Sequence, residues 1–224
     1  MKKVILFFAV CLLSGTTASY AQITKEQQKE RKEITKASKA QLSEKASKTA
    51  RSEAKKMKKD GWQTVPGALP IEKQLDKSYL MQMEYDENMY PKYIMGEGMS
   101  VGGNYDGAKI QALELAKQNL AGQIQTEVTA LIENTVANSQ LSGEEAESIT
   151  RSVLASKNLI SQSLGRTIPI VEIYRTLSNK NKEVLVRIAY NGDAAKKLAK
   201  EAVRKDLEQR GENLHNKLDE LLGW

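Results

Sequence analysis

Three glycines between an expected strand and an expected helix are the first feature of this 224-residue chain that could bind a ligand. They follow the pattern Gly96-x-Gly98-x-x-x-Gly102. Glycines at such a place let the backbone approach a pyrophosphate at a helix N-terminus. The spacing differs from G-x-G-x-x-G, and no alternating series of parallel strands and helices follows. We therefore interpret the glycines as a packing feature and predict no bound cofactor.

The other residues that could do chemistry are few. His215 is the single histidine and Cys11 the single cysteine, which is too few ligands for a metal cluster. No serine lies in a nucleophile-elbow context. The pairs Asp86-Glu87 and Glu144-Glu145 are adjacent in sequence, whereas glycosidase carboxylates usually come from different elements. The sequence therefore predicts no catalytic residue and no metal site.

One carboxylate has a less ordinary position. Glu97 alternates with Met95 and Met99 in the expected strand, and side chains two residues apart share one face of a sheet. Glu97 could therefore lie on a partly buried face. A paired or edge carboxylate is the simpler interpretation. The alternative is an envelope hydrolase in which Glu97 and other carboxylates converge on a cleft.

The elements that must position these residues are a strand from Tyr93 to Val101 and a long helix from about Asp106. The helix carries a sustained apolar stripe. Its members are Ala108, Ala112, Leu115, Ala116, Leu120, Ile124, Val128, Leu131 and Ile132. Its alanines lie nearest the glycines of the strand. Two glycines on one strand face remove side chains there, so we expect the helix to cross the strand closely.

The second half of the chain completes the expected fold. Ser142 and Glu145 match a capping box that would start another helix. Two alternating segments, at about 166–177 and 183–190, flank a polar loop and are typical of a hairpin. We expect an α+β fold in which a small, mostly antiparallel three-stranded sheet packs on the long helix. N-terminal and C-terminal helices would flank that sheet.

Residues 1–21 have the features of a signal peptide. Two lysines precede a short apolar run, and a small-x-small motif ends at Ala21. We expect cleavage between Ala21 and Gln22. The alternative is a lipoprotein signal that uses Cys11. No later stretch is long and apolar enough for a membrane span. We therefore expect an exported protein, located in the periplasm or associated with the outer membrane.

Residues 22–60 form an expected basic helical arm, with 13 basic and 6 acidic residues. Its apolar stripe consists mostly of methyl groups and is too weak to fold a helix alone. A solvated or partly frayed helix is one interpretation. The others are a partner helix, or a basic surface for anionic lipid or envelope polymer. Nucleic acid is not expected, because the arm lacks interleaved aromatic residues. The candidate residues are Lys45, Lys48, Arg51, Lys55, Lys56, Lys58 and Lys59.

The remaining boundaries follow from composition and periodicity. Residues 61–92 are an expected connector with a short helix, 93–191 the α+β core domain, and 192–224 a C-terminal amphipathic helix. Near the chain end, an apolar seam has the spacing of a coiled coil. It could pack on other elements of the same chain, or it could join copies of the chain in a homo-oligomer. That seam comprises Leu214, Leu218 and Leu221.

The core segment resembles a bacterial envelope domain. The resemblance rests on Gly96-x-Gly98, Asp106-x-Ala108, the alanines at 112 and 116, and Leu120-Ala121-x-x-Ile124. It is similar to the domain of the twenty-kilodalton membrane-associated lipoproteins and to the N-terminal domain of flagellar assembly protein T. The wider chain looks like secreted proteins of Gram-negative bacteria. The resemblance covers roughly residues 93–190.

That resemblance implies a small α+β domain that acts by association, with no catalytic residue to carry over. Together with the signal peptide, it predicts a non-catalytic cell-envelope protein with a structural or interaction role. A module that binds anionic lipid or polymer through the basic arm, and an envelope hydrolase, are the alternatives. The expected partner is a protein or another envelope component.

Overall fold

The computed structural model describes residues 25–87, 89–137 and 142–209. It divides into two units, residues 1–44 and 45–224, which are described separately. In the first unit, the described part is helix α1 (Lys25–Ser43). Every α1 residue whose side chain is described is exposed. The helix therefore presents charged and polar side chains to solvent, in keeping with its composition.

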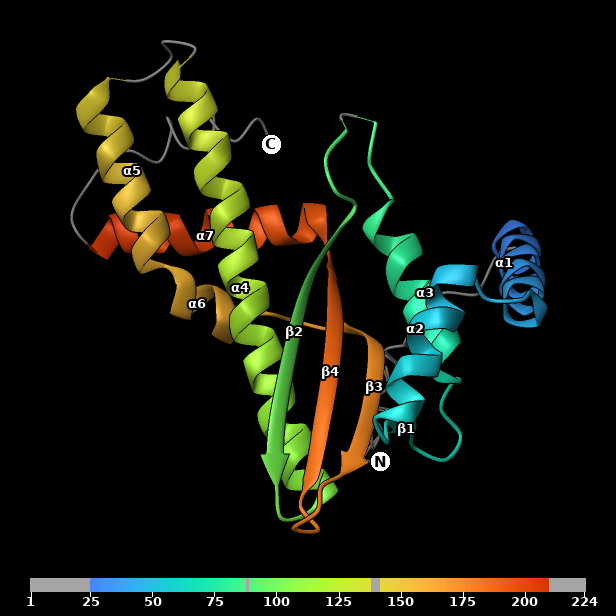
Figure 1. The fold of residues 1–224 in the computed structure, drawn as a ribbon. Helices are drawn as coiled ribbons and strands as arrows, with labels where there is room; N and C mark the ends of the chain where they lie inside the picture. The colour runs from blue at the N-terminus through green and yellow to red at the C-terminus, as the bar shows by residue number, and fades with distance from the viewer. Residues whose placement is uncertain (1–24, 88, 138–141, 210–224) are drawn as a thin grey trace, which may run out of the picture. The chain divides into compact units, whose positions relative to one another are not determined.

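The second unit holds a sheet and the other described helices (Figure 1). Its elements, in chain order, are α2 (Lys48–Lys59), β1 (Gln63–Thr64), α3 (Ile71–Gln82), β2 (Tyr93–Gly102), α4 (Tyr105–Ala137), α5 (Gly143–Ala155), α6 (Lys157–Ser163), β3 (Ile168–Thr176), β4 (Lys182–Asn191) and α7 (Gly192–Gln209). The α+β class is as expected. The segment expected as one basic arm holds two helices, α1 and α2, and these belong to different units.

The sheet has four strands, in the order β1-β3-β4-β2, and every pairing is antiparallel. The expected three-stranded sheet is therefore wrong. The additional strand is β1, in which Gln63 and Thr64 pair with Tyr174 and Ile173 at the outer edge of β3. Two residues are too few to show the alternation that identifies a strand. Their pairing depends on main-chain hydrogen bonds, which any residue except proline can form, so no sequence pattern indicates it.

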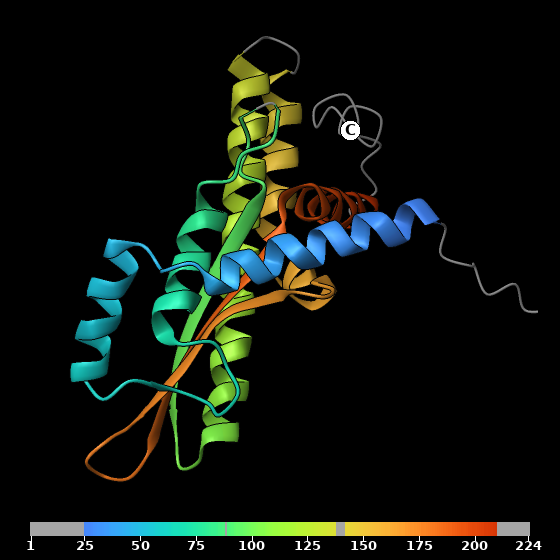
Figure 2. The same cartoon turned by 90° about the vertical axis from the view of Figure 1, so that its right-hand side faces the viewer.

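Helices cover both faces of the sheet. On one face α4 lies against β2 and β4, with α5, α6 and α7 packed around it. This core contains Leu120 and Ile124 of α4 with Val186 and Ile188 of β4. On the other face lie α2 and α3, and Figure 2 shows α3 in front of the strands with α4 behind them. The sheet is thus the middle layer between two separate apolar clusters.

The contact between β2 and α4 is very close. A Cβ atom placed on Gly96 would lie 2.2 Å from the carbonyl oxygen of Ala116, and one on Gly98 would lie 2.1 Å from that of Ala112. Both alanines are fully buried. Side chains at either glycine would therefore push the helix off the strand. The expected role of these glycines in packing is confirmed.

Local hydrogen bonds fix where the helices begin. The side chain of Asn104 accepts a hydrogen bond from the N–H of Gly107 at 2.8 Å, one turn into α4. The capping box at α5 is present as expected, with reciprocal bonds between Ser142 and Glu145. At α2, the hydroxyl of Ser47 accepts from the N–H of Ala50 at 3.3 Å. This cap starts α2 as a helix separate from α1.

We predict that Gly98→Ala destabilises the domain. The new methyl group would overlap the α4 backbone, and overpacking of this kind costs roughly 3 kcal/mol when the backbone itself must move. Gly103→Ala is the matched control, because a Cβ atom there meets nothing within 4 Å. Urea denaturation would measure both free energies of unfolding. Equal values for the two variants would contradict the close contact.

Candidate functional site

The described residues gather positive charge most strongly on α2. The side chain of Lys45, just before the helix, and those of Lys48, Arg51, Lys55, Lys56, Lys58 and Lys59 on α2 are together called the basic face; all seven residues are exposed. The single acidic residue within α2, Glu53, accepts a hydrogen bond from the hydroxyl of Tyr79 on α3. The positive charges of the helix are therefore left mostly without acidic neighbours from the helix itself.

Small apolar residues hold the opposite side of α2 to the domain. Ala46, Ala50 and Ala54 are at most 5% exposed, and they belong to the same cluster as Ile71 and Leu75 of α3. Methyl groups let two helices approach closely, so a stripe that could not fold α2 alone is sufficient once α3 is present. The basic face is thus displayed on a packed helix.

Three polar contacts add to this packing. The N–H of Ser47 donates to Asp76 at 3.0 Å, and Lys58 pairs with Glu72 at 2.8 Å. The Tyr79–Glu53 hydrogen bond is the third. The Ser47 contact lies at the start of α2, the Glu53 contact in its middle and the Lys58 contact near its end. Because each joins α2 to α3, together they fix the rotation of α2 about its own axis and hence the direction of the basic face.

The same contacts shift the pKa values of the groups involved. The hydroxyl of Ser47 lowers the pKa of Asp76. The hydrogen bond from Lys58 lowers the pKa of Glu72. Burial, followed by the hydrogen bond to Glu53, raises the pKa of Tyr79 to about 12. At neutral pH the two carboxylates are therefore ionised and Tyr79 keeps its proton, which is the state that all three contacts require.

A shallow groove runs along the basic face. It has a volume of about 500 Å³. Four of its lining side chains are basic and one is acidic. The lining residues are Arg51, Ala54, Lys55, Lys58, Lys59 and Glu72. Such a groove offers several ammonium and guanidinium donors to one ligand, an arrangement that suits phosphate or carboxylate groups.

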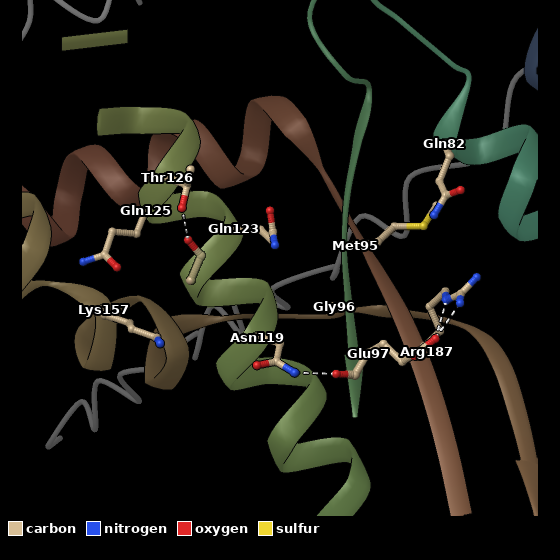
Figure 3. Close-up of a pocket in the computed structure, with 11 residues that line it drawn as sticks. Gln82, Met95, Gly96, Glu97, Asn119, Gln123, Gln125, Thr126, Lys157 and Arg187 are labelled. Atoms are coloured by element: carbon tan, nitrogen blue, oxygen red, sulfur yellow. Dashed lines mark hydrogen bonds and ion pairs between the residues drawn. The ribbon is translucent and has the colours of Figure 1, made fainter. Parts of the chain in front are cut away.

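A second groove, of about 690 Å³, lies along the open edge of β2 (Figure 3). Most of its lining side chains are amides or charged groups, and they come from α3, β2, α4, α6 and β4. The lining residues are Gln82, Met95, Gly96, Glu97, Asn119, Gly122, Gln123, Gln125, Thr126, Lys157 and Arg187. The amide of Asn119 donates to the carbonyl oxygen of Glu97 at 2.6 Å.

Glu97 does not meet another carboxylate in this groove. Its side chain is 43% exposed and pairs with Arg187 from β4, at 2.5 and 2.8 Å. Arg187 also donates to the hydroxyl of Ser78 on α3 at 2.8 Å. Among the lining residues Glu97 is the single carboxylate. General acid–base cleavage of a glycoside needs two, so this groove lacks the arrangement that the hydrolase alternative requires.

A partly buried phenol links α4 to β3. The hydroxyl of Tyr105 donates to Glu172, and Lys109 pairs with the same carboxylate at 2.7 Å. Burial, followed by the bond to Glu172, raises the pKa of Tyr105. The ring of Tyr105 also meets that of Tyr174 edge to face. The carboxylate of Glu172 is thus paired with Lys109 and hydrogen-bonded to Tyr105 within the cluster itself.

Several residues expected at sites fall outside the described ranges. These are Cys11, Ala21 and Gln22 at the signal peptide, and Leu214, His215, Leu218 and Leu221 near the chain end. Cleavage, lipidation and the C-terminal seam therefore stay predictions. Within the described ranges, no cluster of three or more metal-binding side chains occurs. A search of those same ranges also finds no helix with the length and apolar character needed to cross a membrane.

Sequence reasoning singled out Glu97 but missed its partner, and it missed the contacts of Tyr79 and Asn119. Arg187 lies directly opposite Glu97 in the β2–β4 register, so an opposite-charge cross-strand pair was available as a signal once that register was known. The hydrogen bond from the hydroxyl of Tyr79 to Glu53 joins two helices, and no local pattern in the sequence indicates it. Asn119 carried no signal, because an amide on a helix flank has many equivalent roles.

Comparisons with models of protein families, with curated proteins and with solved structures find no match. The resemblance to the membrane-associated lipoproteins and to flagellar assembly protein T therefore stays a prediction. The function has to be argued from the geometry of this chain.

We predict that Tyr79→Phe lowers the free energy of unfolding at pH 8 by about 1.5 kcal/mol, the scale of a hydrogen bond to a charged acceptor. Because folding raises this pKa from 10.0 to about 12, the contribution is complete below pH 10 and disappears as the pH rises toward 12. The difference between wild type and variant should therefore shrink over that range. Urea denaturation at several pH values would measure it.

Tyr85→Phe is the control for that experiment, since the ring of Tyr85 is 52% exposed. At pH 8 it should change the free energy of unfolding by less than about 0.5 kcal/mol, as for other surface substitutions. A Tyr79→Phe effect that stays constant from pH 8 to pH 12 would show that the hydroxyl acts through packing and not through the proton it donates to Glu53.

Proposed function

We propose that this chain is a non-catalytic protein of the cell envelope, exported to the periplasm or the outer membrane, with an interaction role. It binds an anionic partner through the basic face of α2. The observation that carries this proposal is the combination of seven exposed basic residues on one side with a buried alanine stripe on the other. The packed stripe and the contacts to α3 mean that binding does not have to order the helix first, which lowers its entropic cost.

The partner's chemistry follows from the groove beside α2. Three lysines and one arginine line the groove beside a single carboxylate, Glu72, and such donors favour phosphate or carboxylate groups repeated along a surface or a chain. Anionic lipid head groups and an anionic envelope polymer share that chemistry. Each is attracted over about a Debye length, so binding should weaken steeply as salt is added.

Exclusion of the other described surfaces supports this choice. The β2 groove contains one carboxylate, and it is already paired with Arg187. The Tyr105 cluster is internally satisfied. An oligomer through Leu214, Leu218 and Leu221 is a separate proposal. It concerns residues outside the described ranges and does not compete with α2 for the anionic partner.

We predict that replacing Lys55, Lys56 and Lys59 together by glutamine weakens binding to vesicles that contain phosphatidylglycerol. The expected loss is on the order of 100-fold, from roughly fivefold for each lysine near an anionic surface. Vesicle co-sedimentation of the full-length protein would measure it. A parallel titration with soluble polyphosphate distinguishes a lipid surface from a free polymer.

The matched control replaces Lys180, Lys197 and Lys205 by glutamine. These exposed lysines lie outside α2, and the net charge changes by the same amount. The control should lose less than about threefold, since distant surface charges are largely screened. Equal losses in the two triple variants would contradict a defined site on α2. Failure of the wild type to bind either probe would contradict the proposed function itself.

A further inference from the structure

The outer edge of β2 is an unpaired strand edge. β2 ends the sheet, and it pairs with β4 along its whole length, from Tyr93 opposite Asn191 to Gly102 opposite Lys182. In an antiparallel pair, alternate residues turn both main-chain groups toward the partner strand or away from it. The bond from the N–H of Gly192 to the carbonyl oxygen of Lys92, at 2.9 Å, places the even-numbered residues toward β4.

The odd-numbered residues of β2 therefore direct their N–H and C=O groups outward. The contact from Asn119 to the carbonyl oxygen of Glu97 agrees with this assignment. No hydrogen bond from the described part of the chain reaches the outward main-chain groups of Met99 and Val101. Asn119 thus already satisfies the outward carbonyl of Glu97, so the open part of the row lies at Met99 and Val101.

Apolar side chains flank this row on both sides. Met99 is 50% exposed and Val101 is 44% exposed, and both lie on the sheet face opposite α4. On the α4 side, Leu115 is 42% exposed, and its Cβ atom would be 2.9 Å from a Cβ atom on Gly98. An extended segment beside β2 would direct alternate side chains toward these two apolar flanks. That alternation matches the way an added strand is recognised.

Polar groups lie along the other half of the edge. Figure 3 shows Asn119 and Gln123 on the side of α4 that borders β2, with Lys157 from α6 beyond them. Amide side chains both donate and accept hydrogen bonds, so they suit the main chain of a peptide whatever its sequence. The edge therefore combines main-chain pairing with a polar groove at one end and apolar flanks at the other.

The position of α4 favours a single extended segment over a second copy of the chain as the partner of this edge. Gly96 and Gly98 bring the α4 backbone directly onto β2. If two copies paired through β2 with the two-fold axis beside these glycines, both α4 helices would lie on the same sheet face and would cross neighbouring strands that are only about 4.8 Å apart. Packed helices need about 8 to 10 Å between their axes. A single extended segment brings no second helix, so it avoids this overlap.

We infer that the outer edge of β2 accepts an extended segment of a partner polypeptide as an added strand, with apolar residues at alternate positions. Main-chain hydrogen bonds to Met99 and Val101 supply affinity. The apolar side chains on the two sides of the edge, including Leu115, give a preference for peptides with apolar residues at alternate positions. This interaction uses none of the lysines on α2. It therefore stands or fails independently of the proposed anionic partner.

The test begins with a displayed library of random ten-residue peptides, selected on the immobilised full-length protein. Enriched peptides are then synthesised and added to the isotope-labelled protein for amide hydrogen exchange by NMR. Exchange at the outward amides of Met99 and Val101 should slow at least about tenfold when a peptide binds. The inward amide of Ser100 already bonds to β4 and should change little.

Met99→Pro is the decisive variant. It removes an outward N–H and no bond to β4, and proline is tolerated on the open side of an edge strand. It should weaken peptide binding roughly tenfold or more. Met99→Lys, which places a charge at the edge, is a second variant with the same expected direction. Met83→Lys is the matched control at a side chain that is 74% exposed, and it should bind peptide as the wild type does.

Three outcomes would overturn the inference. The first is that no peptide is enriched. The second is that enriched peptides bind without slowing exchange at Met99 and Val101, or bind the Met99→Pro variant equally well. The third is a dimer in analytical ultracentrifugation that dissociates on Met99→Pro, because that result would assign the edge to a second copy of the chain.

Discussion

The close contact of α4 with the glycines of β2 is the constraint on which the rest of the domain depends. Where Gly96 and Gly98 lie, the helix backbone takes the space that side chains would otherwise fill. This brings the alanines of α4 against the sheet and sets the thickness of the main core. It also places α4 over an edge strand. The same contact therefore stabilises the fold and determines which partners can reach the edge of β2.

The second face of the sheet is built on different principles. α2 has no strong apolar stripe, and its methyl groups are buried because α3 and the sheet provide the other wall. Its polar contacts to Asp76, Glu72 and Tyr79 lie on the α3 side. The consequence is a helix with one neutral, tightly packed side and one side of nearly unopposed positive charge. A face of this kind is oriented before any partner arrives, in contrast to a frayed basic arm.

The sequence was informative where local rules decide the structure. The pairing of Gly96 and Gly98 with an alanine-rich helix predicted the close packing, and Ser142 with Glu145 predicted the capping box of α5. Both signals depend on residues near one another or on an element that follows directly. The same was true of the hairpin that joins β3 and β4, whose alternation and polar loop marked both strands.

Tertiary context decided what the sequence could not. β1 exists because Gln63 and Thr64 reach the edge of β3, a main-chain contact between segments more than a hundred residues apart. The pairing of Glu97 with Arg187 likewise needs the β2–β4 register, which no local pattern supplies. The candidate basic residues were identified from composition, but their arrangement on a packed helix follows from the burial of Ala50 and Ala54.

Lysine acetylation footprinting of the full-length protein, with and without phosphatidylglycerol vesicles, tests the central claim most directly. It measures the protection of each lysine in the wild-type protein, so no substitution is needed. The account predicts that Lys55, Lys56 and Lys59 become protected together when vesicles bind, while Lys180 and Lys197 react as before. Uniform protection of all lysines, or protection that spares α2, would contradict a binding surface on that helix.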